Sequence, residues 1–266
     1  MGYSRDAYYK AVKRQKSNTH DNQIVLDIVR REKAILKNCG SKKIYHILKP
    51  EIKKTGIKMG RDKLHKLLKN NDLLVKRKKY KKPKTDSKHH FYKHKNLIKN
   101  LEIDRVNQVW VSDITYIRVN GHWNYLTLIT DLFSRRIVGY AFSKGMSILE
   151  TTQPALNMAI KTRSKKQKTI LHSDRGLQYC SPSFTNQFKK KKITPSMSKA
   201  GDPYENAVAE RVNGILKYEF DLKDNFKNFN IANKEIQNAI YLYNQKRPHW
   251  SINLNTPNQV FFGKVA

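Results

Sequence analysis

The sequence predicts an α/β protein: a mixed five-stranded sheet flanked by helices, preceded by a small all-α, helix-turn-helix-like region. Three observations predict this class. Residues 1–100 carry a net charge of +22 and apolar residues at helical spacing, whereas residues 101–266 carry a net charge of +11. The second part begins with three successive runs of β-branched and aromatic residues. Short apolar runs then alternate with helical patterns, which is typical of strands that pair in parallel.

The composition limits what the protein can be. The 266 residues include 54 Lys and Arg against 21 Asp and Glu, a formal net charge of +33. The 10 Phe, 3 Trp and 14 Tyr can fill a core, which argues against an entirely disordered polycation. The charge favours a polyanionic partner, nucleic acid first and an anionic membrane surface second. Two cysteines, Cys39 and Cys180, exclude a disulfide framework and a cysteine-rich zinc module.

The sequence contains no predicted membrane-spanning segment or signal peptide. No apolar run approaches the roughly 18 residues that would span a bilayer, and residues 1–14 lack the apolar stretch of a signal peptide. We therefore expect no membrane partner and a cytoplasmic location.

The first predicted region, residues 1–75, is helical. Apolar residues recur at helical spacing over 24–36, 44–48 and 64–68. Gly40 is expected to end the first of three short helices and Ser41 to cap the second. In a helix-turn-helix, the third helix would be the recognition helix, and its basic residues would lie outside its apolar face. The alternative is a small basic helical bundle that only packs against the rest of the protein. These basic residues are Arg61, Lys63, Lys66 and Lys69.

A basic linker is predicted over residues 76–104. Seven of the nine residues in 76–84 are basic, and Pro83 interrupts any helix, so we expect an extended segment. We expect it to lie along a phosphate backbone, although a solvated run without function is the alternative. The expected phosphate contacts are Lys76, Arg77, Lys78, Lys79, Lys81 and Lys82.

The predicted core covers residues 105–225 and is followed by a helical extension over 226–266. A three-stranded antiparallel meander is expected over 109–119, 122–130 and 136–142, with a tight Asn120-Gly121 hairpin turn. A helix over 148–162 and a strand over 169–173 follow. Ser181-Pro182 is expected to open a helix before a strand over 193–197. Asp202, with Pro203 and Glu205, has the pattern of a cap for the last core helix.

Three carboxylates are placed unlike ordinary surface acids. Asp113 lies inside the most apolar strand, where a carboxylate needs a partner or a metal. Asp174 directly follows a short strand, at the end where open α/β sheets bind ligands. Glu210 lies within the last core helix, away from its apolar side. An ordinary salt bridge or cap is the alternative for each, and spacing alone does not bring the three together. The helix places Glu210 on one polar stripe with Asn206, Asn213 and Lys217.

The motifs around these acids resemble those of DDE transposases of the two-frame insertion-sequence type, relatives of retroviral integrases. Residues 110–116 (WVSDITY) resemble the first catalytic motif and residues 172–179 (HSDRGLQY) the second. Residues 196–198 and 205–210 resemble the third, with 35 residues between Asp174 and Glu210, as in the family. Lys217 takes the family's basic position seven residues after Glu210. Tyr243-Asn244, Arg247-Pro248-His249 and Thr256-Pro257 resemble its closing signature.

The resemblance implies a ribonuclease H-like core in which Asp113, Asp174 and Glu210 hold two Mg²⁺ ions, with Mn²⁺ as a possible substitute. It implies that Asp113 bridges the ions, while Asp174 and Glu210 each complete one site. Water would free a 3′-OH at the element's end, and that 3′-OH would attack a second phosphodiester. Lys217 would contact phosphate near the cut.

The implied partners are DNA, as element terminal repeats and target DNA, and further copies of the chain in a homo-oligomer on DNA. An upstream-frame helix-turn-helix protein, separate or fused, is a possible partner, and the implied location is the nucleoid of the bacterial cytoplasm. Two other functions remain open: a catalytically inactive DNA-binding protein or repressor, and a ribonuclease H-like nuclease without strand transfer. His172 has either a DNA-orienting or a structural role, whereas packing is favoured for Arg247 and His249.

Overall fold

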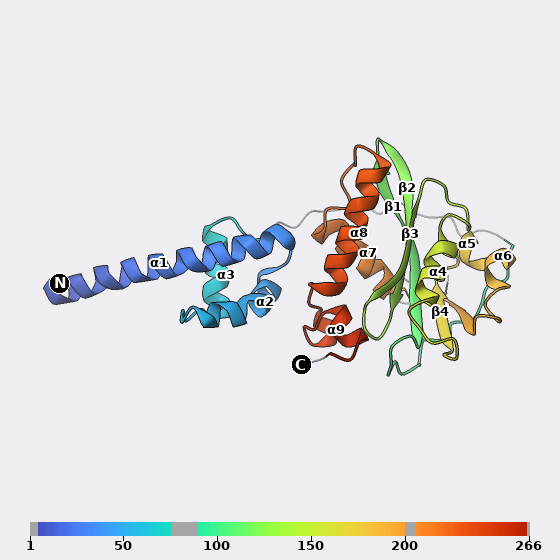
Figure 1. Cartoon of the computed structure of the whole chain (residues 1–266), viewed down its shortest axis with the longest axis horizontal. Coiled ribbons are helices and arrows are strands. Elements are labelled where there is room, and N and C mark those ends of the chain that lie inside the picture. The colour runs from blue at the N-terminus through green and yellow to red at the C-terminus, as the bar shows by residue number, and fades with distance from the viewer. Residues whose placement is uncertain (1–4, 76–89, 200–205, 265–266) are drawn as a thin grey trace. The chain divides into compact units, whose positions relative to one another are not determined.

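The computed structural model describes residues 5–75, 90–199 and 206–264, and the chain divides into two compact units, Met1–Tyr80 and Lys81–Ala266 (Figure 1). The expected phosphate contacts of the basic linker, from Lys76 to Lys82, lie outside the described residues, as do Asp202, Pro203 and Glu205. No helix of the described residues is long and apolar enough to cross a membrane.

The first unit is a three-helix arrangement of α1 (Arg5–Ile35), α2 (Ser41–Lys54) and α3 (Arg61–Asn70). Each helix contributes apolar side chains to its core, including Val29, Ile44 and Leu64, which are fully buried. The expectation of three short helices is wrong for α1, which has 31 residues. Its N-terminal half is mostly exposed where its side chains are described, and the polar residues 13–23 separate it from the apolar stripe on which the expectation was based.

The junction between α1 and α2 also differs from the expectation. Gly40, not Ser41, occupies the N-cap position of α2. The Ser41 hydroxyl instead hydrogen-bonds His65 Nδ1 at 3.0 Å, which ties α2 to α3. The basic residues of α3 named above are all exposed, and Arg61 donates to Asp62 at 2.9 Å.

The second unit contains the predicted mixed sheet, with strand order β3-β2-β1-β4-β5. The strands are β1 (Val109–Val119), β2 (His122–Asp131), β3 (Ile137–Ser143), β4 (Thr169–Ser173) and β5 (Ile193–Met197). β1 pairs antiparallel with β2, and β2 with β3, whereas β1 pairs parallel with β4, and β4 with β5. This confirms the predicted fold class and places β1 at the centre.

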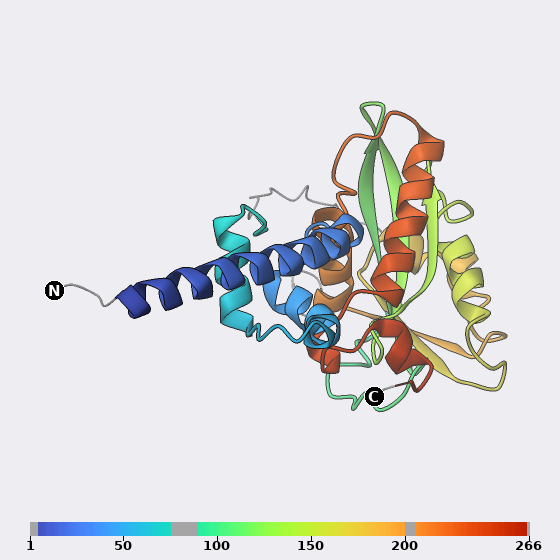
Figure 2. The same cartoon turned by 60° about the vertical axis from the view of Figure 1, so that its left-hand side comes forward.

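Helices cover both faces of this sheet (Figures 1 and 2). On one face lie α4 (Thr152–Ile160), α5 (Leu177–Cys180) and α6 (Pro182–Thr185). On the other lie α7 (Ala207–Glu219) and α8 (Phe229–Gln245). A short 3-10 helix (Trp250–Ile252) and α9 (Pro257–Phe261) complete the described chain.

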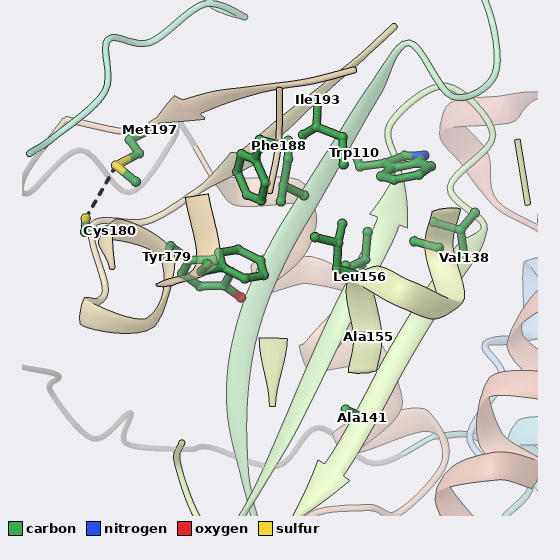
Figure 3. Close-up of a cluster of buried hydrophobic side chains, with 14 residues drawn as sticks. Trp110, Val138, Ala141, Ala155, Leu156, Tyr179, Cys180, Phe188, Ile193 and Met197 are labelled. Carbon is green, nitrogen blue, oxygen red and sulfur yellow. Dashed lines mark hydrogen bonds between the residues drawn. The ribbon is translucent and has the colours of Figure 1, made fainter. Parts of the chain in front are cut away.

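Each face of the sheet has its own core, because alternate residues of β1 point to opposite sides. Trp110 packs with Leu156 of α4 and with Phe188 and Ile193 on the first face (Figure 3). On the second face, Ile117 packs with residues of α7 and α8. The central strand is therefore fixed from both sides.

Two predicted helices are shorter than expected. The helix expected over 148–162 begins at Thr152, because residues 147–151 form a turn in which the Thr151 hydroxyl donates to the Ser147 carbonyl at 2.6 Å. The helix opened by Ser181-Pro182 has only four residues. Ser181 occupies its N-cap position, but its hydroxyl bonds that of Ser183 at 2.9 Å instead of capping the backbone.

The C-terminal signature residues hold the fold together. Arg247, 2% exposed, makes two hydrogen bonds to Glu219 at 2.6 and 2.7 Å and one to His249 at 2.9 Å. Tyr243 donates to the Arg135 carbonyl at 3.0 Å. These contacts are those expected of the packing role that the sequence favoured for Arg247 and His249. They hold the C-terminal end of α7 in place through Glu219.

Replacing Arg247 by Ala should lower the free energy of unfolding of the second unit by about 3–5 kcal/mol, because the Glu219 carboxylate would be left without its buried partner. Urea unfolding followed by tryptophan fluorescence measures this unit alone, because all three tryptophans lie in it. Arg105→Ala is the control, because its pair with Asp104 is exposed and contributes at most about 1 kcal/mol. Equal losses in the two variants would contradict the structural role of Arg247.

Candidate active site

Asp113 occupies the middle of the central strand, on the face covered by α7. Its side chain is half-buried, and its Oδ2 accepts a hydrogen bond from Asn213 Nδ2 of α7 at 2.7 Å. The partner that a carboxylate inside an apolar strand requires is therefore an amide. This contact fixes one oxygen of the carboxylate, and the Ile114 backbone provides a further hydrogen bond to it.

Asp174 emerges beside Asp113 because of the strand register. The parallel pairing of β1 and β4 sets Ser112 opposite Ser173, so the next residue of each strand is an aspartate. The backbone N–H of Gly176 donates to Asp174 Oδ1 at 3.0 Å. A Cβ added at Gly176 would itself lie 3.0 Å from that oxygen, so a glycine suits the close approach.

Glu210 lies in the first turn of α7 and is exposed. The predicted polar stripe is divided in the structure: Asn206 and Asn213 are buried toward β1, whereas Glu210 lies at the outer edge of the helix and Lys217 is half-exposed. Among the residues that the structure describes, no three His, Cys, Asp or Glu side chains are gathered closely enough to hold a metal ion.

The electrostatics nevertheless connect the three acids. Burial, followed by the charges of Asp174 and Glu210, raises the pKa of Asp113 to about 7, although hydrogen bonds from Asn213 and from the Ile114 backbone oppose this rise. Burial also holds the pKa of Tyr179 well above its ordinary value, with contributions from Asp174 and Asp113. The two aspartates thus share one local field, and Glu210 lies within electrostatic reach of it.

The surroundings of the aspartates are hydrogen-bonded on both sides of β1. The Ser112 hydroxyl donates to the Leu128 carbonyl at 3.0 Å and meets the Tyr179 hydroxyl at 2.7 Å. Asn206, the N-cap residue of α7, donates to the Ser112 carbonyl at 3.3 Å. These bonds fix the backbone directly before Asp113, so its carboxylate is held by a rigid strand.

The donor set of this site suits a divalent cation. It consists of carboxylate oxygens that are partly open to solvent, and hard cations such as Mg²⁺ prefer oxygen ligands and retain water. A cation would also relieve the mutual repulsion that contributes to the raised pKa of Asp113.

Sequence reasoning missed the role of Asn213. It placed this residue on the polar stripe but assigned no contact, because the bond to Asp113 joins residues 100 positions apart. His172 is fully buried and its Nδ1 hydrogen-bonds the Ser196 hydroxyl at 2.9 Å, which favours the structural role of the two considered above. Lys217 lies in the last turn of α7, two turns from Glu210.

Two models of the integrase core domain match this chain, over residues 103–203 and 191–257. The first match contains Asp113 and Asp174, and the second contains Glu210. The insertion element IS600 uncharacterized 31 kDa protein of Shigella sonnei is 33% identical over 253 residues, which is 94% of this chain and 91% of that protein.

Two further comparisons are less extensive. Transposase InsF for insertion sequence IS3A of Escherichia coli K12 is 37% identical over 144 residues, which is 54% of this chain and half (50%) of InsF. A chain of the cryo-EM structure of the simian T-cell lymphotropic virus intasome in complex with PP2A regulatory subunit B56 gamma aligns with a TM-score of 0.50 at 17% identity. It covers 88% of this chain and 74% of that one, and this likeness concerns the fold.

The raised pKa of Asp113 predicts a pH effect on stability without divalent cations. The folded state keeps this proton up to about pH 7, whereas the ordinary pKa is 3.8, so between these values the folded state binds more protons and its stability falls as pH rises. Asp113→Asn has no such proton, so its stability relative to the unsubstituted chain should grow over this range. Urea unfolding in EDTA measures it. Asp104→Asn, which changes an exposed acid, is the control, and a growing difference there too would contradict the assignment.

Proposed function

Because the chain belongs to the family of insertion-element transposases with an integrase core, we propose that it binds insertion-sequence ends and catalyses DNA strand cleavage and strand transfer at Asp113, Asp174 and Glu210. The observation that carries this proposal is the register of β1 and β4, which sets Asp174, directly after the end of β4, beside Asp113 within β1. Transposase and integrase cores use such carboxylates with metal ions.

The family generally uses divalent metal ions, and we propose two Mg²⁺ ions here, with Mn²⁺ as a substitute. Asp113, Asp174 and Glu210 would hold them, because their oxygens are the donors that Mg²⁺ prefers. When bound, a metal pair activates the attacking oxygen and stabilises the leaving one.

The chain's own residues prepare this site. Asn213 orients the Asp113 carboxylate through the 2.7 Å bond, and the Gly176 N–H orients that of Asp174. Lys217 contacts phosphate near the cut. Hydrolysis first breaks one phosphodiester and leaves a 3′-OH at the element's end. That 3′-OH then attacks a second phosphodiester, forming one P–O bond as another breaks, so no side chain becomes covalently attached to DNA.

DNA is held mainly by basic residues. The formal net charge of +33 supports binding to phosphates. We assign the exposed Arg61, Lys63 and Lys66 of α3 to the terminal repeats and the lysines and arginine of the basic linker to the backbone. Transposases act on DNA and oligomerise. We propose a homo-oligomer on terminal repeats and target DNA, an upstream-frame helix-turn-helix protein as a further partner, and a location at the nucleoid in the bacterial cytoplasm.

The first test of the site is loss of cleavage without loss of binding. Asp113→Asn, Asp174→Asn and Glu210→Gln should each abolish metal-dependent cleavage of element-end DNA, because each removes a charged oxygen ligand. Their affinity for the same DNA in EDTA should be unchanged. Gel assays of nicking and of mobility measure the two properties, and cleavage at the unsubstituted rate in any variant would refute the assignment.

The same assay separates the alternative functions. A repressor or inactive copy would bind element ends without nicking them in Mg²⁺ or Mn²⁺. A ribonuclease H-like nuclease would cut but would not join the cut end to a second DNA. Joined products that require all three acids are the result expected of a transposase.

Asn213 provides a second prediction. Asn213→Ala removes the hydrogen bond that orients Asp113, and loss of such a supporting contact costs about 10–100-fold in metal affinity or activity. We expect a higher Mg²⁺ concentration for half-maximal cleavage, with DNA affinity in EDTA unchanged. Asn238→Ala on the exposed side of α8 is the matched control. An unchanged Mg²⁺ requirement in Asn213→Ala would exclude this role.

A further inference from the structure

The tip of the β1–β2 hairpin carries an exposed tryptophan among aromatic and basic residues. Trp123 is 52% exposed and pairs across the strands with Arg118, whose guanidinium lies 5.2 Å from the centre of the indole. The Tyr116 ring lies edge-on to the rings of Trp123 and Tyr125, with distances between ring centres of 6.1 and 5.5 Å. We call these four residues, together with Lys144 and Lys227, the hairpin patch.

A hollow of about 370 Å³ adjoins Trp123. Its lining includes Lys144 and Lys227, both exposed, and Phe229, over whose ring the Lys144 ammonium lies at 5.6 Å. Within the part of the chain that the structure describes, no Asp or Glu belongs to this lining. The hollow therefore offers ring faces and positive charge to a ligand, without an opposing carboxylate.

The hairpin tip is held rigidly before any ligand arrives. Asn120 and Gly121 have φ values of 47° and 78°, as a two-residue hairpin turn requires. The Asn120 N–H donates to the Phe226 carbonyl at 2.7 Å, and the Phe226 N–H donates to the Arg118 carbonyl at 2.9 Å. A platform that is already ordered loses little conformational entropy when it binds.

A half-exposed indole beside cations matches the chemistry of a single nucleic-acid strand. Bases stack on aromatic side chains, while basic residues follow the phosphates. We propose that the hairpin patch is a DNA-contact site in which Trp123 stacks on an unpaired nucleobase and Arg118, Lys144 and Lys227 bind the flanking phosphates. This deepens the proposed function, from which it takes DNA as the ligand, and it uses none of the residues assigned above to DNA binding or to the acidic site.

The distance between the two sites suggests which part of the DNA the patch contacts. Arg118 lies five residues beyond Asp113 on the same strand, about 17 Å along β1. This corresponds to about five base steps of roughly 3.4 Å. Because Arg118 lies an odd number of positions from Asp113, the two side chains point to opposite faces of the sheet. The patch would therefore hold a strand a few nucleotides from the cut only where that strand passes around the edge of the hairpin.

The test compares two exposed tryptophans. Trp123→Ala and the control Trp250→Ala, whose indole is 59% exposed elsewhere in the same unit, are assayed in EDTA by fluorescence anisotropy. The probes are a single-stranded oligonucleotide, a duplex with an unpaired tail, and the same duplex fully paired. Trp123→Ala should weaken binding to the first two about tenfold and to the third less than about twofold, because stacking needs an accessible base. Trp250→Ala should bind all three as the unsubstituted chain does.

Two further variants sharpen the result. Trp123→Phe keeps a ring face and should retain most of the affinity. Joint replacement of Arg118, Lys144 and Lys227 by Gln should make the slope of log affinity against log salt concentration shallower by about two for single-stranded DNA. Each phosphate contact contributes roughly 0.7 to this slope. Circular dichroism verifies that each variant is folded.

The proposal is overturned if Trp123→Ala binds all three probes normally, or if Trp250→Ala loses as much affinity. It is also overturned if Trp123→Ala changes only the oligomeric state in light scattering, because the tip would then be a protein contact. Its failure is distinct from failure of the proposed function. Absence of cleavage in Mg²⁺ or Mn²⁺ would refute the latter, while Trp123-dependent binding in EDTA would still support the hairpin patch.

Discussion

The parallel pairing of β1 with β4 is the constraint on which the rest of the second unit depends. It covers only Val109–Ser112 of β1, yet it determines that Asp174, directly after β4, lies beside Asp113 of β1. A slip of one residue would turn Asp113 to the opposite face, away from α7. The two cores, one on each face of β1, make such a slip costly, because Trp110 and Ile117 would exchange environments.

The acidic site is the electrostatic opposite of the rest of the chain. Charges of one sign are brought together at Asp113 and its neighbours, although the molecule as a whole is strongly basic. Such a cluster is unfavourable by itself, and the Asn213 amide offsets only part of this cost. The arrangement is understandable if the acids hold cations while the surrounding lysines and arginines hold a polyanion. Without bound cations, the repulsion between these acids lowers the stability of the folded chain.

Much of the fold could be predicted from the sequence, because the strands are short runs of apolar and β-branched residues. The strands over 109–119, 169–173 and 193–197 have the predicted bounds. The length of α1 could not be predicted, because its first turns are exposed where the structure describes their side chains, and residues 13–23 carry no apolar side chain that would continue the stripe of residues 24–36. Of the site, the motifs indicated the acids, whereas the Asn213 contact depends on how α7 lies against β1, and the position of Glu210 at the helix edge depends on the same packing. The hairpin turn was predicted, but the gathering of Lys144 and Lys227 beside it was not, since they are far apart in sequence.

The helix α7 is fastened at both ends, and this has a consequence for how the gene can decay. Asn206 and Asn213 hold its first half against β1, while Arg247, beyond α8, holds Glu219 at its last turn. A frameshift or stop codon between α7 and Arg247 would leave all three acids encoded and would remove the residue that secures the helix from behind. The C-terminal residues therefore belong to the support of the acidic site, although they lie outside the catalytic motifs.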